Sequence, residues 1–290
     1  MIREPARVRL ELESHPENVV IVRAALAGIA DAAGLDDEYA SDLKTAVSEA
    51  CNNVSLHAYE QSGLMIVDIA VTHDGVSVIV GDRGRGIRRV MANEDRMGLG
   101  LAVISALADK AEFANSDAGG TEVRMWFGRE TGLTTAPSAH QAAVELAAEK
   151  LRMELTLTGD VVAWCSPVDV MRFVVGRLIR TIAAGSHFSL TRVTELRAVN
   201  EAVAEYAELA ADGGVGVAVS GSSRRLVLTG GPFSPPSSTA EPAESDGRST
   251  DELESRREAI AGMVDAIDTE SYRDKELLRL VLLDETREAG

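Results

Sequence analysis

Three polar side chains lie along one face of a helix that the sequence predicts between Leu43 and Glu60. Glu49, Asn53 and His57 follow one another at four-residue spacing. Four residues turn an α-helix by about 400°, so each side chain lies only about 40° round from the last. Asparagine oxygens and water can bind Mg²⁺ beside phosphates, and a nearby carboxylate can orient or deprotonate an attacking hydroxyl. Glu49 and Asn53 could thus serve phosphoryl chemistry, whereas we expect His57 to be structural. Taken alone, the motif favours a solvated helix face.

The segment GDRGRGI, residues 81–87, follows directly on a predicted strand. Asp82 at the end of that strand could accept a hydrogen bond from an exocyclic amine. Gly84 and Gly86 would let the backbone turn sharply and approach a flat ligand, because glycine has no Cβ. The same spacing is common in simple turns, so this segment gains weight only beside other motifs.

Two further segments could complete a nucleotide site. RMGLGLAVI places Gly98 and Gly100 at the start of a predicted helix, where free N–H groups and the helix dipole favour a phosphate. Arg96 could add a cation there. GGTEV puts Thr121 at the head of the last strand, where its hydroxyl could support Asp82 through a water. Glycine as helix punctuation and threonine as a strand former are the alternatives.

Hydrophobic spacing indicates the elements that position these residues. It predicts strands at 7–13, 65–71, 76–82 and 118–127, and helices over 18–33, within 34–59 and over 98–111. THDG between the second and third strands is a plausible hairpin turn. Strands and helices do not alternate regularly, so we expect an α+β two-layer sandwich: a mixed, largely antiparallel sheet with helices on one face.

The pattern recurs beyond residue 150. AVSEA at 46–50 matches AVNEA at 198–202, an offset of 152, and a hairpin-like pair, a helix around 258–267 and a strand follow. The element order recurs too, so we expect a tandem repeat rather than a chance match. The second copy is degenerate, because Glu205 replaces Asn53 and the counterpart of Asp82 is lost. We expect a first domain at 1–130, a linker at 131–150 and a second domain at 151–290, with a disordered loop near 234–250.

Composition excludes several classes of protein. The net charge is −17. Residues 1–130 hold 13 Lys/Arg against 21 Asp/Glu and the remainder 16 against 25, so neither part offers the basic face that nucleic acids need. Cys51 and Cys165 form no metal-ligand spacing and predict neither a zinc site nor a disulfide framework. No apolar run is long enough to span a membrane and the first residues lack a signal core, so we expect a cytoplasmic protein.

Four motifs have been described: Glu49 with Asn53, GDRGRGI, RMGLGLAVI and GGTEV. In order and spacing they resemble the GHKL (Bergerat-type) ATP-binding fold over about residues 5–130. VSEACNNVSLHAYE and the short segment at 87–97 are most similar to the anti-sigma-factor serine kinases of the RsbW type. Sensor histidine kinases need a helical segment with a phospho-acceptor histidine before the asparagine motif, and only His15 precedes it. Gyrase- and Hsp90-like relatives carry longer lids.

The resemblance implies ATP and Mg²⁺ as cofactors and a role for each residue. Glu49 would be the general base and Asn53 the Mg²⁺ ligand. Asp82 would bind the adenine amine with Thr121 behind it. Arg23 in the first helix would meet a partner protein. The glycines and the arginine would surround the nucleotide, Gly84 and Gly86 at the adenine and Gly98, Gly100 and Arg96 at the phosphates.

The resemblance also implies partners. A sigma factor would be held captive, and a serine of a small anti-anti-sigma (STAS-type) protein would be phosphorylated. Proteins of this type commonly act as dimers, so the second copy could form a pseudo-dimer within one chain, or could instead bind a partner or signal. The alternatives are a non-catalytic regulator whose docking surface ATP shapes, and a kinase or ATPase outside sigma control.

Overall fold

The computed structural model describes residues 5–58, 62–84, 94–115, 119–129, 156–235 and 250–284. The expected linker at 131–150 lies outside these ranges, as does nearly all of the expected loop near 234–250. Among the described helices, none combines the length and apolar character needed to cross a bilayer.

The first set of elements follows the order expected from hydrophobic spacing, with one additional strand, β4 (Lys110–Asn115), before the last. The second helix is capped by Asp36, whose carboxylate accepts a hydrogen bond from Tyr39 N, and the first ends at Gly34 with φ +62°. A two-residue turn, His73–Asp74, joins the hairpin strands. We call residues 6–128 the front half. Its elements are β1 (Ala6–Glu13), η1 (Pro16–Asn18), α1 (Val19–Ala33), α2 (Asp37–His57), β2 (Leu64–Thr72), β3 (Gly75–Asp82), α3 (Glu94–Leu107), β4 (Lys110–Asn115) and β5 (Thr121–Gly128).

One prediction in the front half was wrong at both ends. The helix expected over 98–111 begins four residues earlier, at Glu94, and ends at Leu107. Its expected last turn instead leads into β4, which pairs with β5. The turn before β4 is held by Asp109, whose carboxylate accepts a hydrogen bond of 2.6 Å from Gly128 N. Pairing with β5 thus overrides the helix preference of this Lys- and Ala-containing segment.

The second set of elements repeats the order of the first. We call residues 161–283 the back half. The helix expected around 258–267 was misplaced, because α7 ends at Ala261 and the next four residues lead into a strand. The elements are β6 (Val161–Ser166), α5 (Asp169–Gly185), α6 (Leu190–Ala210), β7 (Val215–Ser222), β8 (Arg225–Phe233), α7 (Thr250–Ala261), β9 (Ala266–Tyr272) and β10 (Lys275–Leu283).

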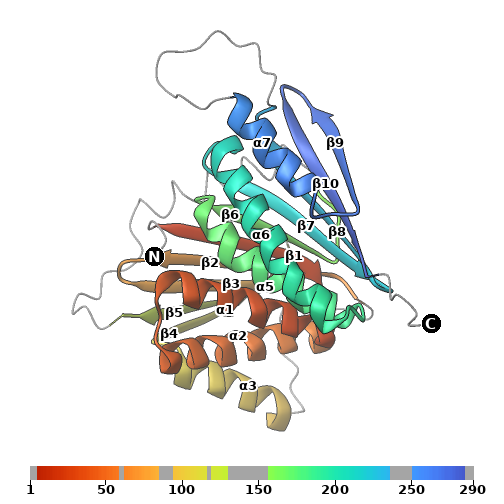
Figure 1. Ribbon diagram of the computed structural model, residues 1–290. Helices are drawn as coiled ribbons and strands as arrows, with labels where there is room; N and C mark the ends of the chain where they lie inside the picture. Colours follow the sequence, from red (N-terminus) through yellow and green to blue (C-terminus); the bar gives the residue numbers. More distant parts are fainter. Residues whose placement is uncertain are drawn as a thin grey trace.

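All ten strands join one sheet in the order β4-β5-β3-β2-β1-β6-β7-β8-β10-β9. Each pairing between neighbouring strands is antiparallel. The helices cover one face of this sheet (Figure 1). The α+β sandwich expected from the sequence is confirmed.

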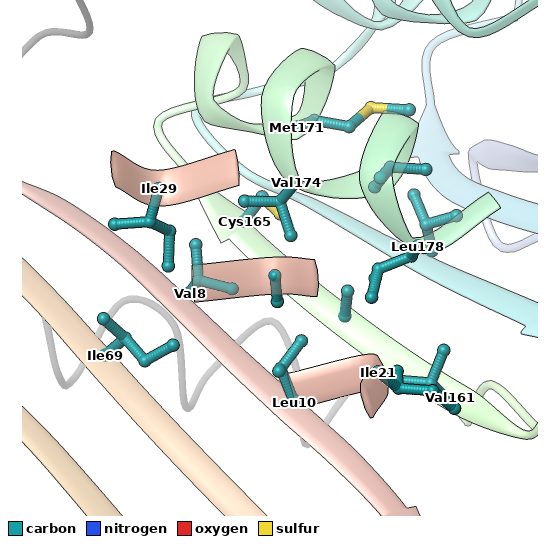
Figure 2. Packing of buried hydrophobic residues seen from close by; sticks show 14 of the residues in the cluster. Val8, Leu10, Ile21, Ile29, Ile69, Val161, Cys165, Met171, Val174 and Leu178 are labelled. Atoms are coloured by element: carbon teal, nitrogen blue, oxygen red, sulfur yellow. The ribbon is translucent and has the colours of Figure 1, made fainter. Parts of the chain in front are cut away.

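The two halves meet at β1 and β6 in the sheet and at α1 and α5 above it. Figure 2 shows the apolar side chains at this junction, with Val8 and Leu10 from β1 lying near Val161 and Cys165 from β6. Across the junction, Leu10 pairs with Ala163. One hydrophobic core includes residues of both halves, so the sheet and its helix layer are continuous across the chain.

Helices α1 and α5 approach closely at Gly28. A methyl group at this position would lie 2.6 Å from the carbonyl oxygen of Phe173, nearer than any real contact allows. An ion pair between Asp31 and Arg177 joins the two helices as well. The junction therefore depends on backbone contact between α1 and α5 as well as on apolar packing.

Candidate functional site

Helix α2 separates its apolar and polar residues onto opposite faces. The apolar positions are fully or almost fully buried: Leu43, Ala46, Val47, Ala50 and Val54. Glu49 and Asn53 are only partly buried. The Nδ2 atom of Asn53 is inaccessible to solvent and has no hydrogen-bond partner among the described residues. Burying an amide N–H without an acceptor costs free energy. Asn53 therefore has an unused N–H donor at the position where the sequence predicts a bound nucleotide.

Gly100 of α3 lies against the two polar residues of α2. A Cβ at this position would be 3.4 Å from both Asn53 Oδ1 and Glu49 Oε2. The helix begins at Glu94, so the N–H of Gly100 is not one of the free donors of the first turn. Contrary to the prediction, Gly100 therefore does not offer a helix-terminal N–H group. It lies close against Glu49 and Asn53 instead.

Asp82 ends β3 in a buried position, with 4% of its surface exposed. Its carboxylate accepts hydrogen bonds from Gly84 N at 2.7 Å and from Thr121 N at 3.2 Å. Burial raises the pKa of this carboxyl, and the bonds from Gly84 and Thr121 only partly oppose that shift. Thr121 therefore contacts Asp82 through its backbone N–H, whereas the predicted support from its hydroxyl through a water stays a prediction. Asp82 remains an acceptor inside a low-dielectric site.

Two glycines around Asp82 have no room for a side chain. A Cβ on Gly84 would lie 2.1 Å from Ala58 O at the end of α2, and one on Gly120 would lie 2.1 Å from Asp82 O. Gly120 also has φ +90°, which side chains rarely adopt. The sequence prediction did not assign Gly120 to the site, although the GGT sequence carries its signal. These contacts bring the end of α2, the end of β3 and the start of β5 together.

The remaining predicted site residues are less completely described. Gly86 and the side chains at 94–99, including Arg96 and Gly98, lie outside the described residues, as does the side chain of His57. Arg23 is exposed on α1, and its Nη1 donates to Ser48 Oγ at 2.9 Å. Ser48 directly precedes Glu49 in α2, so Arg23 is anchored at the edge of the site. Its partner role stays a prediction.

The chain is similar to known proteins over the region that contains this candidate site. The histidine kinase-like ATPase domain matches residues 12–127. The serine-protein kinase RsbW of Halalkalibacterium halodurans is 30% identical over 125 residues, which cover 38% of this chain and 77% of that protein. This chain belongs to the histidine kinase-like ATPase family.

Other members of the histidine kinase-like ATPase family show the same extent of similarity. The serine-protein kinase RsbW of Bacillus pumilus is 34% identical over 128 residues, 38% of this chain and 79% of that protein. The anti-sigma F factor of Caldanaerobacter subterraneus subsp. tengcongensis is 30% identical over 129 residues, 41% and 90% of the two chains. The family match contains Glu49, Asn53, Asp82, Gly84, Gly100, Gly120 and Thr121.

For a histidine kinase-like ATPase, Asp82→Asn tests the base-binding end of the site. We expect adenine-nucleotide affinity to fall about 10- to 100-fold, because a hydrogen bond to a charged group contributes about 1.5–3 kcal/mol. Asparagine keeps the size of the side chain but only one of the two acceptor oxygens that Gly84 N and Thr121 N use, so circular dichroism checks the fold of the variant before titration. Calorimetric titration with ADP and Mg²⁺ measures the change.

Asp109→Asn is the matched control, since Asp109 also accepts a backbone N–H, from Gly128 at the opposite end of β5 from Thr121. The control should bind nucleotide normally. Equal affinity in the Asp82 and Asp109 variants would contradict a base-binding role for Asp82.

Proposed function

We propose that the chain is an ATP-binding, anti-sigma-factor-like serine/threonine kinase that sequesters a sigma factor and phosphorylates a serine on a STAS-type antagonist. The observation that carries the proposal is the contact of Glu49 and Asn53 with Gly100, on elements that also hold Asp82 against Thr121. The names of the relatives, serine-protein kinase RsbW and anti-sigma F factor, support the same function.

The residues present fit an adenine nucleotide and Mg²⁺. Asp82 offers a buried acceptor for the adenine amine, and Gly100 puts no side chain beside Asn53. Asn53 has an oxygen for a metal ion and a buried amide donor in need of an acceptor, which a phosphate oxygen can supply. Mg²⁺ prefers oxygen ligands and is commonly held by few protein groups together with substrate phosphates. We place Gly86, Arg96 and Gly98 around the same nucleotide.

Glu49 supplies the general base. As the serine hydroxyl oxygen of the antagonist bonds to the γ-phosphorus of ATP, Glu49 accepts the hydroxyl proton, and the bond from that phosphorus to the bridging oxygen breaks to release ADP. Mg²⁺ would neutralise charge on the phosphates. Glu49 stays partly buried next to Asn53 and Gly100. At that position the carboxylate would lie beside the phosphates that Asn53 binds through Mg²⁺.

The proposal extends to the organisation of the chain. Residues 1–130 would be the kinase domain, 131–150 a linker and 151–290 a degenerate copy of the same domain. The pairing of β1 with β6 and the contact of α1 with α5 support a pseudo-dimer within one chain, in the place of a dimer of two chains. Arg23, exposed on α1, would contact the partner protein.

The test begins with capture of partners on the immobilised full chain, from the lysate of its own cells, with ATP and Mg²⁺. Bound proteins are identified by mass spectrometry and their phosphoserines are mapped. We expect a sigma factor and a small STAS-type protein phosphorylated on serine, with much less phosphate at limiting ATP when Asp82→Asn is used. Undiminished phosphorylation with this variant at limiting ATP, or the absence of both partners, would refute the proposal.

A further inference from the structure

The back half has a counterpart of each element that builds the site, so its residues can be matched by position. Helices α2 and α6 each contain 21 residues, and their caps Asp36 and Ser189 accept hydrogen bonds from the residue three positions later. Aligning these caps superimposes the buried positions of the two helices and places Tyr206 opposite Asn53. The sequence match, which gave Glu205, was one residue out of register.

The back half also has different residues in the places of Asp82 and Thr121. In the front half Val80 pairs with Val123, two residues before Asp82 and two after Thr121. In the back half the corresponding pair is Gly230 with Leu278. Two residues after Gly230 is Pro232, in the place of Asp82, and two residues before Leu278 is Glu276, in the place of Thr121. Phe233, the next residue of β8, is 1% exposed and pairs with Glu276. A carboxylate is therefore still present, but it comes from the other strand.

The third difference between the halves is at the position of Gly100, where we place the phosphates. Strands β4 and β9 begin at Lys110 and Ala266, and the fully buried Ile104 and Ile260 precede them by the same number of residues. This match places Arg256 where the front half has Gly100. Where the front half has a glycine against α2, the back half therefore has an arginine facing α6.

The replacements contact one another. Tyr206, with a fully buried side chain, donates its hydroxyl proton to Glu276 Oε1 at 2.8 Å and lies edge-on to Phe233, with ring centroids 5.3 Å apart. Burial, followed by the contact with Glu276, raises the pKa of Tyr206, so its hydroxyl stays a donor. Arg257 of α7 donates to Glu276 Oε2 at 3.4 Å.

Helix α7 is joined to the rest of the back half by further contacts of its two arginines. Arg256 pairs with Glu205 on α6, and Arg257 donates to Thr269 Oγ1 on β9. The Arg256–Glu205 pair is about two-fifths exposed, and such pairs contribute little. The carboxylate of Glu276, only 8% exposed, is shared by Tyr206 and Arg257 and is the stronger connection.

We propose that the back half is closed by its own side chains in the place where the front half takes its nucleotide. Tyr206, Phe233 and Glu276 fill the base and metal positions, and Arg256 fills the phosphate position. Helix α7 is then held against α6 and the sheet whether or not nucleotide is present. This inference rests on the proposed function. It follows that the chain binds one adenine nucleotide, and that nucleotide slows amide exchange only in α3 and the residues around it.

Hydrogen–deuterium exchange of the full chain, with and without ADP and Mg²⁺, tests this closure. In the absence of nucleotide we expect amides of α7 to exchange at least about tenfold more slowly than those of α3. Nucleotide should protect α3 and leave α7 unchanged. Arg256→Ala with Arg257→Ala should accelerate exchange in α7 by at least about tenfold without altering nucleotide affinity, whereas Arg197→Ala, an exposed arginine of α6, should alter neither.

Several outcomes would overturn the closure. Exchange in α7 as fast as in α3 without nucleotide would do so, and this comparison needs no variant to fold. Protection of α7 by ADP, or a calorimetric stoichiometry of two nucleotides per chain, would also exclude it. Loss of the proposed function has a different signature, because a chain that binds no nucleotide would show no protection of α3 while α7 stayed slow.

Discussion

Replacing Glu49 with glutamine is expected to reduce phosphoryl transfer by about 100- to 10,000-fold, the usual contribution of a general base. Glutamine keeps the size and polarity of the side chain beside Gly100 and Asn53, but it cannot accept the proton of the attacking serine. Nucleotide affinity should stay within a few-fold, because Asp82 and Asn53 are unchanged. Transfer is measured with radiolabelled ATP and the captured antagonist, and affinity by calorimetry.

Glu38→Gln is the control, since Glu38 is an exposed acid in the first turn of the same helix. The control should phosphorylate normally. If Glu49→Gln retains full transfer, another group is the base. If neither form transfers phosphate but both still regulate the partner in an ATP-dependent way, the protein is a nucleotide-controlled binder and not a kinase.

Gly28→Ala is expected to lower the free energy of unfolding by about 1–3 kcal/mol, the usual cost of overfilling a packed interior. On an exposed helix the same change would stabilise by up to about 1 kcal/mol, because alanine is the better helix former. The sign reverses here because the new methyl group would lie 2.6 Å from the backbone oxygen of Phe173, and a backbone atom cannot rotate away. Urea unfolding followed by circular dichroism measures the change.

The matched control is Gly185→Ala, at the last position of α5, where a Cβ would meet nothing within 4 Å. This change should leave stability equal or slightly higher. Equal effects of the two substitutions would show that the close approach of α1 to α5 does not contribute to stability.

The sequence predicted the elements whose hydrophobic pattern is decided locally. Helix α2 has an apolar stripe, and β2 and β3 alternate regularly on either side of a two-residue turn. Strands β4 and β9 were missed because both lie at the edges of the sheet. Their polar sequences, KAEFAN and AIDTESY, alternate weakly, and the neighbouring strand decides their conformation.

The site was predictable where one segment carries the chemistry. Glu49, Asn53, Asp82 and Thr121 stand in short motifs, and the structure brings Asp82 and Thr121 into direct contact. The position of Gly100 inside α3 was missed, because the predicted helix began too late. Gly120 was not assigned for a different reason: its constraint is contact with Asp82 O, from a strand that lies far away in sequence.

Sequence identity alone could not give the residue-by-residue correspondence between the two halves. AVSEA and AVNEA match at an offset of 152, yet the helix caps and buried positions shift the correspondence by one residue. Alanine-rich helices tolerate such slips, because a one-residue shift exchanges one small side chain for another. Only the caps and the buried positions fix which residue replaces Asn53.

The pairing of β1 with β6 lies within one polypeptide, and this has a consequence for how the protein responds to its own abundance. Two separate chains that share such a pairing come apart as they are diluted, since their association depends on the square of their concentration. Two halves of one polypeptide instead keep an effective concentration that dilution does not change. The joined sheet should therefore persist at a few copies per cell, and regulatory output should rise in proportion to the number of chains made.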